Sequence, residues 1–341
     1  MSKSFVSVGV TILDIVGYPI TGIPEGESTE VIQSIHLCAA GTAAAPAVIA
    51  SRMGMDSALV GAIADDDVGF LVRHKLEKEG VDTTLLDLRS DLPTAATMLP
   101  INPNGARPNW HMPGAFLLLE ISDTARERVI NADHLHWGGI GLLFNYDGPA
   151  GADILAQARA NGAITTGDLI APGPQTPEAV KALAPHLDYF MPSIDEALEL
   201  SGEQSVEAAA EFFMAQGAGG CVIKCGGDGA YLANSTGVSA RIPAIEGVNV
   251  IDTSGCGDSF CAGFQVGLAN GMDPVQAAYF ASATAAQVAS AVGSDGGMAI
   301  IDGQCVTVGG HVGGMRLVSV DRGSATFRGG GIEVTLRLPT D

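Results

Sequence analysis

Short apolar runs rich in β-branched residues alternate along the chain with longer segments in which apolar residues recur at helical spacing. The apolar runs predict strands at residues 5–10, 58–60, 134–137, 164–168, 189–191 and 220–224. The helical segments predict helices at residues 43–53, 68–79, 152–161, 177–184, 194–201 and 206–216. Because this alternation is typical of strands joined by crossover helices, it indicates βαβ units and a mostly parallel sheet.

Two segments, at about residues 15–38 and 95–113, interrupt the alternation. Both lack helical period and are rich in turn residues, and the second contains the hairpin signal Asn102-Pro103-Asn104-Gly105. We expect the two segments to pair as a small β-sheet over the carboxyl edge of the main sheet, where open α/β folds bind ligands. Such a sheet would form a lid over the site.

The last segment, residues 300–341, is rich in glycine pairs and differs in charge from the rest of the chain. Its four arginines balance four acidic residues, so the net charge of −21 resides entirely in residues 1–299. Two runs, at 315–320 and 332–338, resemble strands. The sequence therefore predicts a main domain over 1–299 and a Gly-rich tail that is either an appended hairpin or partly disordered.

The composition of this 341-residue chain limits the classes of partner that it can bind. A net charge of −21 disfavours broad binding to nucleic acid or to anionic membranes, although a local pocket can still hold one anionic ligand. The sequence has neither the pattern of a signal peptide nor an apolar run long enough to span a bilayer. Its six cysteines lack zinc-site spacing. We therefore expect a cytoplasmic protein with reduced thiols.

The most informative motif covers residues 252–258 and reads Asp252-Thr253-Ser254-Gly255-Cys256-Gly257-Asp258, followed by an Ala-rich helical pattern. Gly255 and Gly257 permit a sharp turn that directs backbone amides to one point, just before a helix N-terminus that favours an anion. Asp258 would then be a well-positioned general base for a hydroxyl that attacks phosphorus. The alternative is structural: a tight turn with Asp258 as a helix cap.

This motif resembles the D-T-x-G-A/C-G-D signature of the ribokinase-like, or PfkB, carbohydrate kinases. Three further stretches resemble family motifs in the expected order: residues 9–14, which end in Asp14, residues 40–69, and residues 222–230. The likeness covers about residues 4–297. It implies a three-layer α/β/α sandwich with a small β-sheet lid, and a kinase that transfers the γ-phosphoryl group of ATP to a hydroxyl of a sugar or sugar-like molecule.

The resemblance also implies residue roles. Asp258 would be the general base, and the amides of Gly255, Cys256 and Gly257 would form the anion hole. Asp14, Gly41, Ala45 and Asp258 would contact the substrate, and Lys224, Gly226, Gly229 and Ala283 would border the nucleotide. Glu196 would act on Mg²⁺ through water, and Asp252 would contribute to a K⁺ site. Asp168 occupies a position where relatives place polar residues near the phosphates.

Two departures from the family pattern leave the acceptor open. Ser193 stands where the family's N-x-x-E motif has Asn, so the Mg²⁺ role depends mainly on Glu196. Ala45 stands where many sugar kinases have an Asn that reaches the sugar. A nucleoside kinase and a weakly active sugar-binding regulatory protein are therefore alternatives. By analogy we expect a homodimer formed through the lid.

Overall fold

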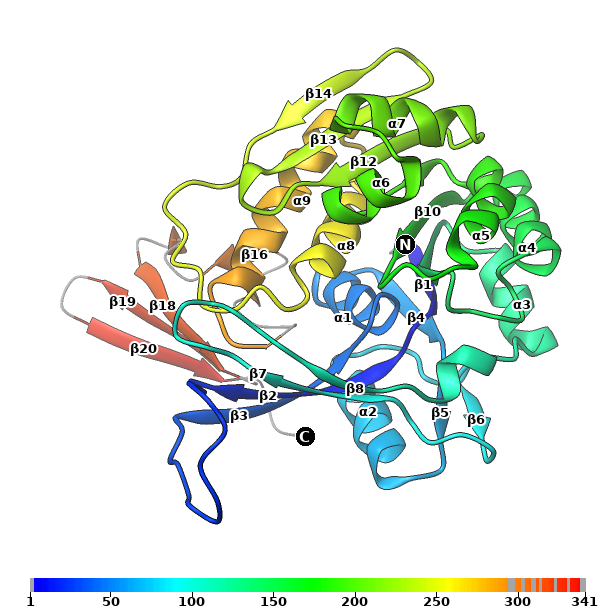
Figure 1. Ribbon diagram of the computed structural model, residues 1–341. Coiled ribbons are helices and arrows are strands. Elements are labelled where there is room, and N and C mark those ends of the chain that lie inside the picture. The colour runs from blue at the N-terminus through cyan, green and yellow to red at the C-terminus, as the bar shows by residue number, and fades with distance from the viewer. Residues whose placement is uncertain are drawn as a thin grey trace.

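An eight-stranded sheet forms the centre of the protein, a computed structural model that describes residues 3–293 and, beyond them, strands between residues 298 and 337 (Figure 1). The strands lie in the order β14-β13-β12-β11-β10-β9-β1-β4. Six are parallel, and β13 and β14 run antiparallel at one edge. Their bounds are β1 Ser4–Gly9, β4 Asp56–Val60, β9 His134–Ile140, β10 Ile164–Leu169, β11 Tyr189–Phe190, β12 Gly220–Lys224, β13 Ala230–Asn234 and β14 Ser239–Ile242. The expected mostly parallel sheet is confirmed.

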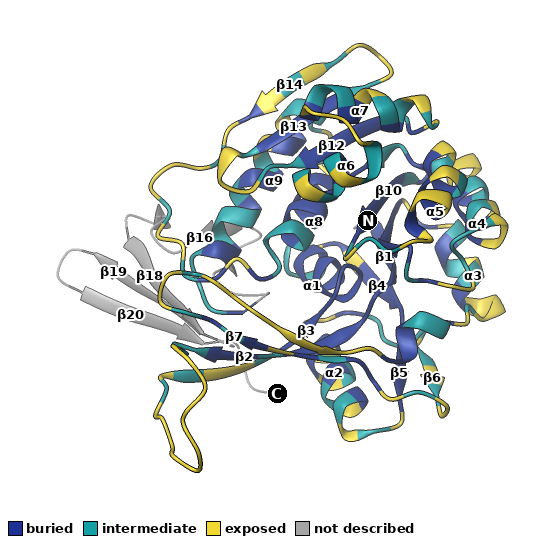
Figure 2. Ribbon diagram, viewed as in Figure 1, coloured by how far each residue is buried: buried dark blue, intermediate teal, exposed yellow. Residues whose placement is uncertain are grey.

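Helices cover both faces of this sheet and give three layers. One face carries α1, α8 and α9, and the other carries α3 to α7, so the strands between them are buried (Figure 2). Trp137, Phe190 and Phe213 are fully buried on the second side. The helices are α1 Ala44–Arg52, α3 Asp123–Ile130, α4 Pro149–Ala160, α5 Thr176–Leu183, α6 Ile194–Ser201, α7 Val206–Ala215, α8 Cys256–Ala269 and α9 Pro274–Ala289. The sandwich implied by the family resemblance is thus confirmed.

The two interrupting segments form a four-stranded sheet of order β3-β2-β7-β8, and this sheet is the lid. Its strands are β2 Ile12–Tyr18, β3 Ser34–Ala40, β7 Ala96–Pro100 and β8 Trp110–Met112. The hairpin signal is borne out, because Gly105 donates to the Asn102 carbonyl in the loop between β7 and β8. Helix α2, Asp67–Lys78, packs under β2 and β3. It begins where the Asp66 carboxylate accepts from the Gly69 amide.

Smaller elements complete the structure. β5 Ala62–Ala64 pairs with β6 Asp87–Arg89. Short 3₁₀ turns lie at Ala115–Leu118, Ala184–His186 and Gly226–Asp228. In the C-terminal segment the strands are β15 Met298–Ile301, β16 Gln304–Thr307, β17 His311–Val312, β18 Met315–Asp321, β19 Ser324–Gly329 and β20 Ile332–Arg337, which pair only among themselves in the part that the structure describes. Both strand-like runs expected there are found, whereas the domain boundary at residue 299 stays a prediction.

The sequence pattern missed α3, α9, β13 and β14. Helix α3 is short and mostly polar, and its start depends on a single cap in which Ser122 accepts from the Ala125 amide. Strand β14 is half exposed, so its alternation is weak. Within the described residues, no helix is both long enough and apolar enough to cross a bilayer.

Candidate active site

The first turn of α8 lies at the carboxyl edge of the central sheet, facing the lid (Figure 1). Gly255 precedes the helix with φ +71°, a left-handed conformation that glycine adopts without strain. Asp258 is half-buried in the first helical turn. Burial raises the pKa of its carboxyl group, an effect that the charges of Lys224 and Arg107 oppose. The sequence motif therefore places a carboxylate and a helix N-terminus side by side.

The three amides expected to form an anion hole differ in their contacts. The Cys256 amide donates to the Thr253 carbonyl at 3.3 Å. The amides of Gly255 and Gly257 have no hydrogen-bond partner among the described residues. Burial raises the pKa of the Cys256 thiol to about 12, which agrees with a small filler and not with a nucleophile. Two free amides thus remain for an anion.

Asp252 holds the loop before α8 in shape. One of its carboxylate oxygens accepts from the Ser254 amide at 2.8 Å and from the Ser254 hydroxyl at 2.7 Å. The other accepts from the Gly293 amide at 2.8 Å. This fully buried carboxylate therefore ties the loop to the chain that follows α9.

Lys224 is paired beneath α8 instead of being free at the surface. Its amine lies 2.5 Å from a carboxylate oxygen of Asp168 and 3.6 Å from the Cys261 sulfur. A Cβ atom added at Gly257 would lie 3.4 Å from the same amine. Burial alone would lower the pKa of Lys224, but the negative groups around it, Asp168 first among them, together raise the pKa. The cation therefore supports the first turn of α8 from below.

Ser193 and Glu196 form a capping box at the start of α6. A carboxylate oxygen of Glu196 accepts from the Ser193 amide at 2.8 Å and from the Ser193 hydroxyl at 2.7 Å, while the Glu196 amide donates back at 3.4 Å. The Glu196 charge also raises the pKa values of Asp168 and Asp258, so the three carboxylates share one region. Serine thus supplies the helix cap that orients Glu196 at this position.

A polar row crosses the inner face of the lid. Asp14 on β2 is paired in register with Thr97 on β7, and Thr97 with His111 on β8. The Thr97 hydroxyl lies 3.0 Å from the His111 Nδ1. Burial, and then the nearby charge of Asp258, raise the pKa of Asp14 to about 7, which Thr97 and Arg107 partly offset. Asp14 therefore belongs to the same site as Asp258, although 244 positions separate them in the chain.

The remaining predicted residues lie on other elements of the fold. Gly41, with φ +99°, leaves an added Cβ only 2.5 Å from the Val10 carbonyl oxygen, and Ala45 is buried in the first turn of α1. Gly226 and Gly229 have positive φ in the turn between β12 and β13. Ala283 is half-buried in α9. Their substrate and nucleotide roles stay predictions.

Arg107 and Thr97 lie outside the sequence motifs that predicted the site. Arg107 lies in the loop between β7 and β8, and its Nε donates to the Thr253 hydroxyl at 3.0 Å. A sequence signal existed, because Arg107 is the only lysine or arginine between Arg89 and Arg126. Thr97 is recognisable only through its register opposite Asp14.

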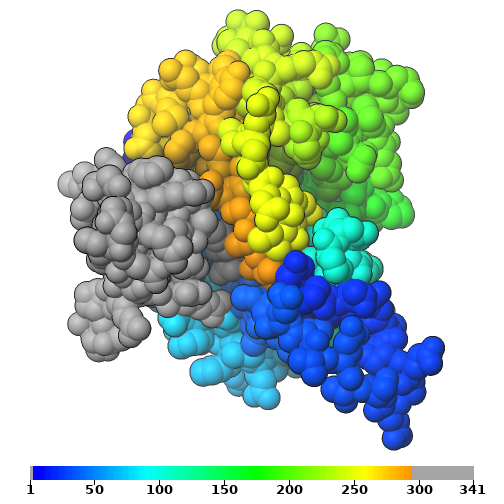
Figure 3. Space-filling model, turned by 90° about the vertical axis from the view of Figure 1, so that its left-hand side faces the viewer, coloured from blue at the N-terminus to red at the C-terminus, as the bar shows by residue number. Residues whose placement is uncertain are grey.

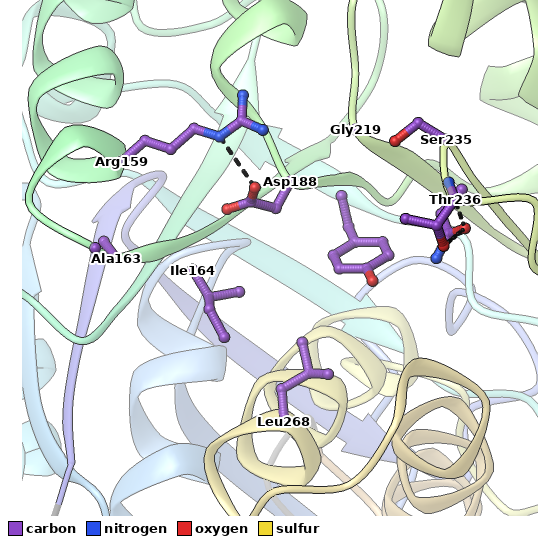
Figure 4. Close-up of a pocket in the computed structure, with 11 residues that line it drawn as sticks. Arg159, Ala163, Ile164, Asp188, Gly219, Ser235, Thr236 and Leu268 are labelled. Carbon is purple, nitrogen blue, oxygen red and sulfur yellow. Dashed lines mark hydrogen bonds and ion pairs between the residues drawn. The ribbon is translucent and has the colours of Figure 1, made fainter.

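A pocket of about 550 Å³ lies away from this centre, at the amino ends of β10 to β12 (Figure 4). Arg159 pairs there with Asp188 at 3.0 Å, and none of the predicted site residues lines the pocket. In parallel α/β sheets, ligands bind at the opposite, carboxyl edge. The geometry therefore favours the centre around Asp258 and Asp14.

Comparison with known proteins agrees with this fold. The family model of the pfkB family carbohydrate kinases matches residues 2–300. The aminoimidazole riboside kinase of Salmonella typhimurium is 29% identical over 274 residues, which cover 76% of this chain and 84% of that protein. The crystal structure of ribokinase from Thermotoga maritima has a TM-score of 0.69 at 25% identity and covers 86% of this chain and 95% of that one.

A third relative has both substrates bound. The structure of Arabidopsis thaliana ribokinase complexed with ribose and ATP has a TM-score of 0.71 at 21% identity, and covers 86% of this chain and 95% of that one. With a family match over nearly the whole chain and a fold shared with these kinases, the protein belongs to the pfkB family of carbohydrate kinases, enzymes that phosphorylate a hydroxyl group.

Proposed function

We propose that the protein transfers the γ-phosphoryl group of ATP to a hydroxyl of a sugar or sugar-like small molecule. One observation carries the proposal: Asp258 lies in the first turn of α8 beside the unpartnered amides of Gly255 and Gly257, and its charge acts on Asp14 of the lid. A base, an anion hole and an acceptor-binding carboxylate thus share one region. Phosphoryl transfer needs little more than such positioning and charge stabilisation.

In this proposal Asp258 accepts the proton of the attacking hydroxyl. Its raised pKa makes it a better proton acceptor than an ordinary surface aspartate, and the charges of Lys224 and Arg107 favour its carboxylate form. The amides of Gly255 and Gly257 stabilise the charge on the transferred group. Asp14 and the Gly41 turn orient the acceptor.

Mg²⁺ fits the residues around Glu196. One oxygen of this carboxylate is occupied by Ser193, whereas the other has no partner among the described residues. That oxygen can accept from a water of a hydrated Mg²⁺, since this ion usually keeps several of its waters when a protein binds it. Bound Mg²⁺ would neutralise charge on the phosphates of ATP.

A K⁺ ion at Asp252 is a separate part of the proposal. Three hydrogen bonds already hold this carboxylate, so it can contribute only remaining lone pairs alongside backbone carbonyls. We expect K⁺ to raise turnover by ordering the loop before α8. Equal turnover in potassium chloride and in tetramethylammonium chloride at matched ionic strength would exclude activation by K⁺ at Asp252.

The acceptor is a sugar or a nucleoside. The similarity to an aminoimidazole riboside kinase favours a nucleoside as the acceptor. Ala45 also favours it, because this chain lacks the Asn that would reach a sugar hydroxyl from that position. On the other side of the centre, Gly226, Gly229 and Ala283 would border the nucleotide, with Lys224 beneath it. A panel of sugars, sugar phosphates, polyols and nucleosides in a coupled ADP-release assay with Mg²⁺ and K⁺ distinguishes these classes.

Asp258→Asn tests the mechanism. We expect kcat to fall by about 10²–10⁴, the usual contribution of a general base, with ATP affinity nearly unchanged. Near-wild-type turnover of Asp258→Asn would remove this residue from the role. If the wild-type protein releases ADP with no compound of the panel, the result would instead favour a sugar-binding regulatory protein.

We further propose a homodimer formed through the lid in the cytoplasm. Ile35, Met98 and Trp110 are 66%, 53% and 51% exposed on the lid, and Met98 pairs in register with Trp110. Such neighbouring apolar side chains are typical of an interaction surface. Sedimentation of the wild type and of Met98→Asp tests this, and a wild type that is monomeric at micromolar concentration would contradict it.

A further inference from the structure

Arg107 connects the lid to the loop that precedes α8. Its Nε donates to the Thr253 hydroxyl at 3.0 Å, across 146 positions of sequence. In Figure 3 the cyan segment that contains the loop between β7 and β8 lies beside the yellow segment before α8 and next to the blue segment of the lid. A side chain of the lid therefore reaches the edge of the anion hole.

The charge of Arg107 acts on the centre of the site. It opposes the rise that burial causes in the pKa values of Asp14 and Asp258, so its charge acts on the acceptor side and the base side alike. Lys224 is the other cation that acts on Asp258, but Asp168 neutralises it at 2.5 Å. Among the described residues, Arg107 is thus the cation of the site that no carboxylate pairs.

The donor geometry of Arg107 suits a phosphoryl group. The contact with Thr253 uses Nε, whereas the two terminal nitrogens have no hydrogen-bond partner within residues 3–293. A guanidinium presents its donors in a planar fork that matches the oxygens of a phosphate. Anchoring at Nε orients the fork and leaves its other donors available.

We propose that Arg107 is a catalytic residue that contacts the transferred phosphoryl group from the lid. In the transfer, the acceptor oxygen forms a bond to the γ-phosphorus as its O–H bond gives the proton to Asp258. The bond from that phosphorus to the β,γ-bridging oxygen breaks, and its electron pair leaves with ADP. Arg107 stabilises charge on the phosphoryl oxygens, so the lid completes the site. This inference rests on the proposed kinase chemistry.

Arg107→Ala and Arg107→Lys test this role, with Arg128→Ala as the control. Arg128 pairs with Asp56 on the surface at 2.7 Å, so its loss changes net charge equally without touching the site. With the best acceptor of the panel, we expect kcat of Arg107→Ala to fall by about 10²–10³, as for other lost donors to a transition state. Arg107→Lys recovers part of this loss, and KM for ATP changes little.

Affinity for MgADP and for MgADP with aluminium fluoride, a mimic of the transferred group, gives a readout without turnover. We expect Arg107→Ala to weaken binding of the fluoride complex by about 10²-fold and of MgADP by less than about threefold. Equal weakening of both, or a kcat within threefold of wild type, overturns the proposal. A raised acceptor KM with unchanged kcat also overturns it, and assigns Arg107 to an anionic group of the acceptor.

The same titration separates this inference from the proposed function. If Asp258→Asn keeps its turnover, the assignment of the base fails, but discrimination between MgADP and its fluoride complex still reports on Arg107. Thr253→Val keeps the charge and removes the anchor of Nε, so we expect an intermediate loss of about tenfold in affinity for the fluoride complex. An effect of Thr253→Val equal to that of Arg107→Ala would indicate a structural contact alone and overturn the proposal.

Discussion

Asp14→Asn is expected to stabilise the protein at alkaline pH while impairing the acceptor site. Asp14 is 7% exposed, and burial together with the charge of Asp258 raises its pKa from the usual 3.8 to about 7. The folded state therefore binds this proton more tightly than the unfolded state. Asparagine has a similar shape, remains neutral at every pH and can still bond to Thr97.

The direction and the size of the effect of Asp14→Asn on stability follow from this difference in proton binding. Between about pH 4 and pH 7 the folded protein holds a proton on Asp14 that the unfolded chain has lost, so the contribution of Asp14 to stability falls as the pH rises. The decrease is complete above about pH 7 and amounts to roughly 4 kcal/mol for a rise of about three pKa units. Asp14→Asn lacks this decrease. The free energy of unfolding of Asp14→Asn should therefore equal that of wild type at about pH 4 and exceed it by roughly 4 kcal/mol at about pH 8.

Urea unfolding at several pH values, followed by tryptophan fluorescence from the buried Trp137, measures this advantage. Asp65→Asn is the matched control, because Asp65 is exposed and such surface changes usually stay within about 0.5 kcal/mol. A difference between Asp14→Asn and wild type that does not change with pH would refute the reasoning. So would a variant less stable than wild type at about pH 8.

Three further variants probe the frame of the site. Lys224→Met leaves the buried carboxylate of Asp168 unpaired and should lower the free energy of unfolding by about 3–5 kcal/mol in a denaturant titration. The double variant that adds Asp168→Asn should recover part of this stability. A loss below about 1 kcal/mol in Lys224→Met would contradict the expectation. Ser193→Ala removes the cap on α6 and should cost about 0.5–2 kcal/mol in the same measurement, whereas Ser193→Asn, which can cap, should cost less. Gly255→Ala forces a side chain into a left-handed position, so we expect the free energy of unfolding to fall by about 1 kcal/mol and kcat in the ADP-release assay to fall. Unchanged kinetics would argue against an anion hole formed by this turn.

Most of the architecture could be predicted from local patterns. The apolar runs of β1 and β12 and the periodic helices α2 and α7 encode their own structure, because burial on both faces of a strand, or on one face of a helix, requires that spacing. Elements whose stability comes from packing, such as α3 and β14, lack this signal. Their pattern is too short or too polar to stand out.

The sequence by itself determined the motif at residues 252–258, since a left-handed glycine and a carboxylate in a first helical turn are local consequences of residue order. Tertiary structure alone decided which distant residues meet that turn. Asp14 arrives on one lid strand, Arg107 from a lid loop and Lys224 from the end of β12. Contacts between residues more than a hundred positions apart depend on strand order and register, which local spacing does not encode. For the same reason the pairing of Lys224 with Asp168 emerged only from the fold.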